Sequence, residues 1–313
     1  MPFVVRRLLA VAPTVLVVAT VTFIALQVIP GDVAAIMLGI DARAEDVERL
    51  RREFGLDRPL VVRYLEWLAN VVRGDLGTSV TYREPVARLI AARLPVTFSV
   101  AFAAMLVALA VALPLGIVAA RRAWSPIDLA VLAGSQLGLA VPTFWMGILL
   151  LLGFAAALPI FPLQGYVAFT RDPLQWLRHL ALPAIALGAE RAAALARLVR
   201  ASVLDELNRD YVRTAQSKGL AGPYVLRRHV LLNALIPVLT VAGLQLGFLL
   251  GGTIVLEQVF GLPGLGRLLL QGIYSRDLAV VQGTVLTIAV VFALLNLIVD
   301  LLYAVVDPRI TYD

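Results

Sequence analysis

The chain carries a short polar stretch between two long apolar runs, Asn208-Arg-Asp-Tyr-Val-Arg-Thr-Ala-Gln-Ser-Lys-Gly-Leu-Ala-Gly-Pro223. Asp210 can cap a helix here, because its carboxylate can accept hydrogen bonds from the free N–H groups of the first turn. Val212, Ala215 and Gly219 recur at helical spacing and form one narrow face of small residues. Gly219 can end the helix in a left-handed conformation, and Pro223 prevents it from resuming. The stretch therefore predicts about two to three turns of exposed helix.

Composition places the flanking apolar runs in a membrane. Of the 313 residues, 60% are hydrophobic and the mean hydropathy is +0.89, whereas a soluble protein is about half apolar. The chain has no cysteine, which excludes disulfides and thiolate metal sites. Its two histidines, His179 and His229, are far apart in the sequence, so we expect no metal site. The sequence predicts an all-α integral membrane protein.

No catalytic constellation is visible. Lys218 is the only lysine, and Gly219 follows it, whereas a phosphate-binding loop needs a lysine followed by Ser or Thr. The carboxylate pair Asp205-Glu206 lies in a polar loop, where solvation explains it. We therefore expect a chain that is not an enzyme and binds no cofactor, with any ATP hydrolysis carried out by another subunit.

Six apolar segments are long enough to cross a bilayer, whose hydrocarbon core takes about 20 residues of helix. We expect the spans near residues 8–29, 94–120, 128–153, 179–200, 230–256 and 278–299. A signal peptide would need a small-residue cleavage site after the first segment, and Pro30-Gly31-Asp32 does not resemble one, so we expect this segment to stay uncleaved. Pro142 is expected to kink the third helix.

Residues 31–95 form a polar insert with ten arginines and ten acidic residues. Its apolar spacing predicts three amphipathic helices. The first carries Val47, Leu50 and Phe54 on one face and ends at Gly55. The second starts at Pro59 and ends near Gly74; the third starts at Pro85. We interpret the insert as a small helical cap on the membrane surface.

Charge in the short loops predicts the orientation in the membrane. Residues 200–228 carry six basic and three acidic residues, and residues 121–128 carry two arginines against Asp128. The loops 154–177 and 257–277 are each balanced between basic and acidic residues. Because basic loops stay on the cytoplasmic side, we expect both termini and the 208–223 stretch in the cytoplasm.

Several motifs together resemble one known family. Tyr211-Val-Arg-Thr-Ala-Gln-Ser-Lys-Gly219 is similar to the cytoplasmic coupling helix of ABC-importer permeases. Arg213 and Thr214 replace the Glu and first Ala of the general motif, and Pro237 comes later than its proline; the dipeptide/oligopeptide/nickel branch shares both departures. The motif Gly55-Leu-Asp-Arg-Pro59 also resembles a loop of the branch's first, B-type permease subunit. Phe260-Gly-Leu-Pro-Gly-Leu-Gly-Arg267 resembles an outer loop of the family, and Asp307-Pro-Arg-Ile310 resembles its usual ending.

The resemblance implies a type-1 importer permease fold in a bacterial inner (cytoplasmic) membrane. We expect an N-terminal segment with the first span at 1–30, an extracytoplasmic insert at 31–93, a permease core at 94–306 with the coupling helix at 210–220, and a cytoplasmic tail at 307–313. The implied partners are a second permease subunit in a heterodimer, two ATPase subunits that bind ATP and Mg, and an extracytoplasmic binding protein. The chain would also contact membrane lipid, and we expect it to bind no nucleic acid.

The same resemblance implies residue roles. The ATPase-coupling residues would be Tyr211, Val212, Arg213, Thr214, Ala215, Lys218, Gly219 and Leu220. Ala215 and Gly219 would permit close approach, and Arg213 and Lys218 would pair with ATPase carboxylates. Glu190 lies within the predicted fourth span, so it is either a substrate-pathway contact or the partner of Arg191 or Arg197 in a structural ion pair.

The implied function is transport of di- or oligopeptides, and three alternatives stay open. The same class of importer also serves nickel, glutathione and other small solutes, because the binding protein selects the ligand. An ion-driven secondary transporter would need carboxylates in several spans and internal repeats, and this chain offers essentially Glu190. A membrane scaffold that transports nothing would need another partner for the 208–223 helix.

Overall fold

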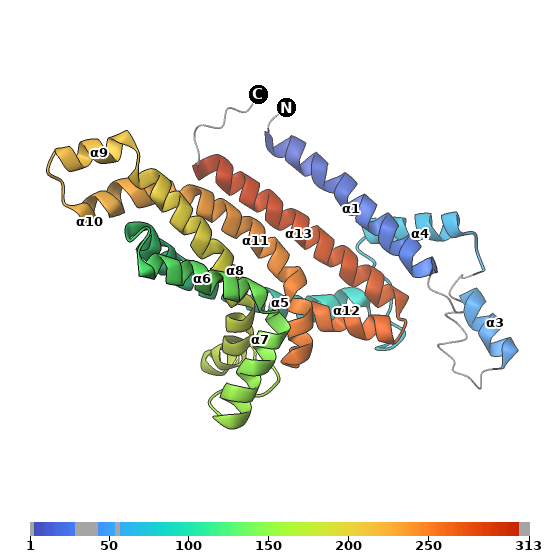
Figure 1. The fold of residues 1–313 in the computed structure, drawn as a ribbon. Coiled ribbons are helices and arrows are strands. Elements are labelled where there is room, and N and C mark those ends of the chain that lie inside the picture. Colours follow the sequence, from blue (N-terminus) through green and yellow to red (C-terminus); the bar gives the residue numbers. More distant parts are fainter. Residues whose placement is uncertain (1–2, 29–42, 54–56, 307–313) are drawn as a thin grey trace. The chain divides into compact units, whose positions relative to one another are not determined.

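The computed structural model describes residues 3–28, 43–53 and 57–306. This part of the chain is built from helices and contains no β-strand (Figure 1). The all-α expectation is therefore confirmed for the described residues. In chain order, the elements are α1 (Phe3–Val28), α3 (Ala44–Glu53), α4 (Leu60–Val72), α5 (Val86–Arg121), α6 (Pro126–Ala140), α7 (Thr143–Leu150), the π-helical η1 (Leu151–Ala157), α8 (Pro173–Leu207), α9 (Asp210–Ser217), α10 (Gly222–Val225), the π-helical η2 (Leu226–Val230), α11 (Leu231–Val259), α12 (Leu265–Tyr274) and α13 (Leu278–Val306).

Three of these helices are long and apolar enough to cross a membrane: Val86–Arg121, Gly222–Val259 and Leu278–Leu301. The bent pair α6 and α7–η1 makes a fourth if it counts as one span. The count of six spans is therefore not confirmed. In α1 the apolar stretch described is Val11–Gln27, and α8 is interrupted by charged residues, Glu190 and Arg191 among them.

The chain divides into two compact units, and the first comprises residues 1–95 with 264–293. Its core joins the start of α5 to α12 and α13 through Val86, Leu89, Ile90, Leu265, Leu268 and Val280. A polar clip fixes the segment before α5: Ser79 Oγ donates to Asp277 Oδ2 at 2.6 Å, and the Thr81 N–H donates to the same oxygen at 3.0 Å. Tyr82 Oη donates to Gln271 Oε1 of α12 at 2.7 Å.

The second unit comprises residues 96–263 with 294–313. Here α8 packs against α6, α7 and α11. Small residues allow the helices to approach closely, as is usual between membrane helices. A Cβ on Gly188 of α8 would lie only 2.7 Å from the Ala104 carbonyl oxygen of α5, and a Cβ on Gly243 of α11 would lie 2.7 Å from Val299 Cγ2 of α13.

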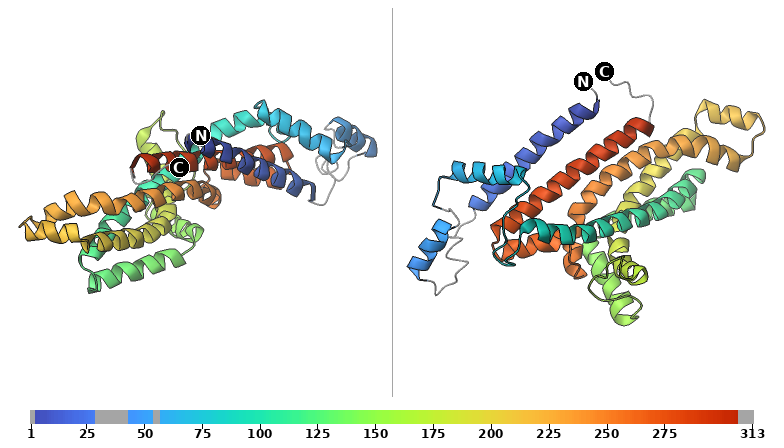
Figure 2. Two further views of the ribbon diagram at one scale, coloured as in Figure 1. Left: turned by 90° about the horizontal axis from the view of Figure 1, so that it is seen from above. Right: turned by 180° about the vertical axis from the view of Figure 1, so that it is seen from behind.

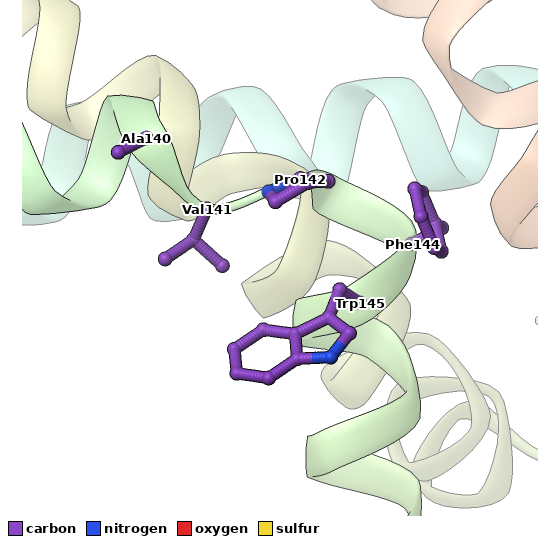
Figure 3. Close-up of a pocket in the computed structure, with 5 residues that line it drawn as sticks. All are labelled: Ala140, Val141, Pro142, Phe144 and Trp145. Carbon is purple, nitrogen blue, oxygen red and sulfur yellow. The ribbon is translucent and has the colours of Figure 1, made fainter.

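Two prolines behave differently from the sequence-based expectation. We expected a third insert helix from Pro85 and a separate span from residue 94, but α5 is one helix of 36 residues that passes through Pro95. Conversely, Pro142 does not kink one helix; it ends one and starts another, with a bend of 96° between α6 and α7–η1 (Figure 3). The cause is Val141, which is extended (φ −86°, ψ 118°), as the residue before a proline prefers.

Other boundaries agree in part with the expectations. The first two insert helices are confirmed as α3 and α4, and Gly74 follows α4 with φ +83°. The assignment of Glu257 to an outer loop is wrong, because α11 continues to Val259 and buries Glu257 completely. Thr97 Oγ1 of α5 donates to its Oε1 at 2.7 Å. The predictions for Phe54, Gly55 and the 307–310 motif lie outside the described residues.

Candidate functional site

The 208–223 stretch folds as a helix that projects from the end of a hairpin. Figures 1 and 2 show α9 and α10 beyond the adjoining ends of α8 and α11. The helix α9 has eight residues, Asp210–Ser217, which confirms a helix of about two turns. The predicted cap by Asp210 is wrong: Arg209 takes the cap position with extended backbone and no side-chain cap, and Asp210 is the first helical residue. The Asp210 carboxylate still lies at the end of the helix that favours negative charge.

The end of α9 is set by Gly219, as predicted. Gly219 has φ +78°, and its N–H donates to the Gln216 carbonyl oxygen at 2.9 Å. The Leu220 N–H reaches back to the Ala215 carbonyl oxygen at 3.4 Å, so the two bonds form a Schellman motif. Pro223 lies in the first turn of α10, where its missing N–H costs no helical bond. The proline thus starts the next helix after this turn.

The inner face of α9 packs on the chain itself. Val212 is fully buried and Ala215 is 8% exposed. They belong to a cluster whose other members lie on α5, α8, α10, η2 and α11: Ala120, Val199, Val203, Val225, Leu226, Val230, Ala234 and Val238. The close approach expected of Ala215 is therefore made to the chain's own core. Gly219 is exposed, and a Cβ there would meet no atom of this chain within 4 Å.

The outer face of α9 presents the remaining predicted residues to the surroundings. Arg213, Thr214 and Lys218 are exposed, and Leu220 is 39% exposed. Arg213 lies 3.8 Å from Asp210, but both side chains are largely open to solvent, so this pair holds neither of them firmly. The structure thus separates the predicted set into a buried anchor, Val212 and Ala215, and an exposed cationic edge, Arg213 and Lys218.

Tyr211 joins α9 to both neighbouring long helices. Its hydroxyl donates to Glu206 Oε2 of α8 at 2.5 Å and accepts from Asn233 Nδ2 of α11 at 3.1 Å. The same Asn233 amide donates to the His229 carbonyl oxygen at 3.1 Å. We call the three side chains Glu206, Tyr211 and Asn233 the tyrosine clasp.

The Tyr211 hydroxyl of the tyrosine clasp stays protonated at physiological pH. Burial raises the pKa of Tyr211, and the hydrogen bond to Glu206 raises it further, while the bond from Asn233 acts in the opposite direction. A raised pKa in the folded state means that any stability linked to this proton is present below about pH 10 and is lost only as the pH rises further. The phenol therefore remains a hydrogen-bond donor throughout the neutral range.

A buried ion pair joins α8 to the first turn of α6. Arg200 Nη2 donates to Asp128 Oδ2 at 2.6 Å, and Arg200 Nε donates to Asp128 Oδ1. The side chain of Asp128 is 1% exposed and that of Arg200 is 14% exposed. The Trp124 N–H donates to Asp128 Oδ2 at 2.8 Å, and the Arg200 guanidinium lies 5.9 Å from the centre of the Trp124 ring. This group anchors the part of α8 that leads to α9.

Glu190, the predicted pathway residue, lies beside Arg191 in α8. The distance from Arg191 Nη2 to Glu190 Oε1 is 3.8 Å, and the side chains are 25% and 32% exposed. Arg197, the other cation considered as its partner, instead donates from Nη1 to Gln136 Oε1 of α6 at 3.1 Å. The structure therefore shows the ion pair with Arg191, and a role for Glu190 in the substrate pathway stays a prediction.

The bend between α6 and α7 opens a shallow pocket of about 320 Å³. It is lined by Ala140, Val141, Pro142, Phe144 and Trp145. In Figure 3 the side chains of Val141 and Trp145 point to the same side of the bend and Phe144 to the other. The lining offers apolar contact and no titratable group. Among the described residues, no group of three or more His, Asp and Glu side chains could hold a metal ion.

Two protein-family models match the chain. Residues 112–312 match the inner membrane component of binding-protein-dependent transport systems, and residues 1–101 match the N-terminal membrane component of the same systems. The chain belongs to this permease family. The permease is therefore a multi-pass inner membrane protein and the non-catalytic subunit of its transporter.

Curated relatives match the permease over nearly its whole length. A Brucella suis biovar 1 protein, whose name provisionally assigns it to a peptide transport system permease, is 45% identical over 308 residues, 98% of each chain. The glutathione transport system permease protein GsiC of Escherichia coli O6:H1 is 40% identical, and the oligopeptide transport system permease protein AppB of Bacillus subtilis is 38% identical, each over 99% of both chains. These matches confirm the resemblance to the peptide branch of ABC-importer permeases.

A solved structure supports the fold of the permease. An inward facing MetNI methionine ABC transporter chain superposes with a TM-score of 0.56 at 20% sequence identity, over 70% of this chain and 96% of that one. At this identity the likeness speaks for the fold alone. The permease thus has the helical arrangement of an ABC-importer membrane subunit.

Sequence reasoning missed the polar side chains that fix α9 and the ends of its neighbouring helices. Asp128 and Arg200 were counted only among the charges that predict orientation. No contact of Glu206 or Asn233 with Tyr211 was predicted. A signal was present for the first pair, because opposite charges at the ends of two predicted spans lie where a buried ion pair can form. For Glu206 and Asn233 no comparable signal exists, since their meeting depends on how α8 and α11 pack.

Proposed function

We propose that the permease forms half of the translocation pathway of an ATP-driven importer for di- or oligopeptides. The names of two of its relatives support peptides, and the name of GsiC supports glutathione as the alternative. The proposed assembly contains a second permease subunit, two ATPase subunits with ATP and Mg, and an extracytoplasmic binding protein that delivers the ligand. Competition between a labelled dipeptide and glutathione for uptake would distinguish the two substrates.

The observation that carries the proposal is the two-sided construction of α9. Its inner face is buried by Val212 and Ala215, and its outer edge presents Arg213 and Lys218. Such a helix can seat in a cleft of an ATPase subunit without losing its attachment to α8 and α11. Closure of the two ATPases on ATP would then move these helices and switch the open side of the pathway, as alternating access requires.

The docking role of the cationic edge can be tested by charge reversal. The double substitution Arg213→Glu and Lys218→Glu is expected to reduce copurification of the ATPase several-fold. An exposed ion pair contributes only about 0–1 kcal/mol, but here two attractions become two repulsions. The matched control is Arg121→Glu with Arg122→Glu, which makes the same charge change in the exposed side chains of the last residue of α5 and of the residue that follows it. Equal loss in both variants, or no loss in either, would contradict docking through α9.

The role of Glu190 can be separated from that of a structural ion pair. If Glu190 contacts substrate, Glu190→Gln should lower uptake and leave both complex assembly and the basal ATPase activity intact. If the pair with Arg191 is structural, the variant should assemble poorly, because a half-buried charge within α8 loses its partner. Normal assembly together with normal uptake would exclude both roles.

We also propose that both termini and α9 lie in the cytoplasm and that the insert lies outside. The basic excess in residues 200–228 supports this orientation. Single cysteines can be introduced at Thr81 and Ser217, which are both exposed, in a chain that has no cysteine of its own. An impermeant thiol reagent should label the first in intact cells and the second only after lysis. The reverse pattern would overturn the orientation.

A further inference from the structure

The short helix α4 carries three different faces. Tyr64 and Trp67 lie on the face that packs against α1. At about 100° per residue, a second face carries Val61, Leu65, Leu68 and Val72, of which Val61, Leu65 and Val72 are 67%, 57% and 82% exposed. A third face carries the exposed polar residues Glu66 and Asn70. A helix with an exposed apolar face and an exposed polar face on opposite sides has the pattern of one that lies in a membrane interface.

Contacts with α1 fix the position of α4. Tyr64 Oη and Thr20 Oγ1 are hydrogen-bonded at 2.7 Å, and Arg63 Nη1 donates to Gln27 Oε1 at 3.2 Å. Phe23 of α1 is 3% exposed, and its ring centre lies 5.3 Å from that of Tyr64. Aromatic, polar and charged side chains thus attach α4 to the last turns of α1.

This attachment places α4 at a definite depth. Thr20 lies eight residues before the end of α1 at Val28, about 12 Å along the helix. Half of the hydrocarbon core is about 15 Å thick. If α1 crosses the bilayer as the proposed function requires, with the end of its apolar stretch at Gln27 at the outer edge of the hydrocarbon core, the Thr20 contact lies below the lipid headgroups. The 13 residues of α4 cover only about 20 Å, so the helix itself cannot span the membrane.

We propose that α4 is an interfacial helix whose Val61–Leu65–Val72 face inserts between the acyl chains of the extracytoplasmic leaflet. Acyl chains fit this face because it is apolar and lies at their depth, while Glu66 and Asn70 point towards headgroups and water. Arg58 Nη1 donates to Glu66 Oε1 at 2.9 Å and to Glu66 Oε2 at 3.1 Å, so the negative charge on the polar face is paired with a positive one. The helix thereby anchors the insert to the membrane. The inference rests on the proposed importer topology.

Spin labels can test which medium covers each face. Single cysteines replace Val61, Leu65, Glu66 and Asn70, and each labelled permease is reconstituted with cysteine-free partner subunits in lipid nanodiscs. Collisions with oxygen, which concentrates among acyl chains, are compared with collisions with a water-soluble nickel chelate. Labels at positions 61 and 65 should favour oxygen several-fold over the labels at positions 66 and 70. Glu66 is the matched control, since it adjoins Leu65 but lies on the polar face.

Two results would overturn the inference. Preference of the Leu65 label for the nickel chelate would place the face in water, and shielding from both reagents would show that a protein partner covers it. Since Val61 and Leu65 are exposed, replacing either should leave the fold intact. If one of the two labelled variants does not fold, the other still tests the apolar face. ATP-dependent uptake is measured on the same samples. Active samples with a wet or shielded Leu65 would refute the lipid contact and leave the permease assignment standing.

Discussion

Replacing Gly219 with valine is expected to lower ATP-dependent uptake roughly 5- to 30-fold, the change in population that 1–2 kcal/mol produces. Gly219 ends α9 with φ +78°, and this left-handed backbone costs a residue with a side chain about 1–2 kcal/mol. A branched Cβ increases the strain. The strain falls on the two Schellman hydrogen bonds that hold the end of α9. The amount of permease in the membrane should stay the same, because Gly219 lies outside the long apolar helices.

The matched variants are Gly219→Asn and Gly219→Ala. Asparagine tolerates the left-handed backbone and should retain most of the uptake, whereas alanine should fall between asparagine and valine. Within this chain a Cβ at position 219 meets no atom within 4 Å, so a clash inside the subunit is not the cause. If asparagine is as harmful as valine, the loss comes from side-chain volume at the ATPase contact. Full uptake by the valine variant with its ATPase bound would remove α9 as the coupling element.

Replacing Asp128 with asparagine is expected to destabilise the permease by about 3–5 kcal/mol, because Arg200 is left as an uncompensated charge with little access to water. The Asp128 side chain is 1% exposed and meets two guanidinium nitrogens and one backbone N–H. Asparagine keeps the size but cannot supply the charge. The measurement is the fraction of permease that remains monodisperse after heating in detergent, compared with the parent protein.

Two controls make this result specific. Arg58→Ala breaks the pair with Glu66, whose side chains are both about half exposed, and should cost only about 0–1 kcal/mol. Adding Arg200→Gln to Asp128→Asn removes the unpaired charge, so the double variant should recover part of the lost stability. An Asp128→Asn protein as heat-resistant as the parent would show that this ion pair does not hold α8 in place.

Local features of α9 could be predicted from the sequence because they depend on few residues. The spacing of Val212 and Ala215 indicates a helical face, and Gly219 followed by a proline indicates its end. What could not be predicted is whether that face packs on the chain itself or on a partner. Small residues at helical spacing look the same whether they meet a partner or their own chain. Only the positions of α8 and α11 show that Val212 and Ala215 face inward.

Two misplaced boundaries, near Pro95 and at Pro142, show a second limit. A separate span was expected from residue 94, and a kink within one helix was expected at Pro142. At Pro95 the helix continues, with Val96 and Val100 buried on the same helix immediately afterwards. At Pro142 the preceding Val141 becomes extended and the chain turns. The preference of a proline is about the same in both cases, so packing of the surrounding helices decides between continuation and a turn.

The tyrosine clasp determines how firmly α9, the proposed coupling helix, is attached to the long helices beside it. A helix that is held only by a flexible loop can slide when it is pushed, and the displacement is absorbed before it reaches the membrane. In α9 the second residue, Tyr211, is bonded to Glu206 of α8 and to Asn233 of α11 at once. Any shift of α9 must therefore stretch one of these bonds or carry both helices along. If α9 docks on an ATPase subunit as proposed, a rigid attachment of this kind would transmit even a small displacement there to α8 and α11.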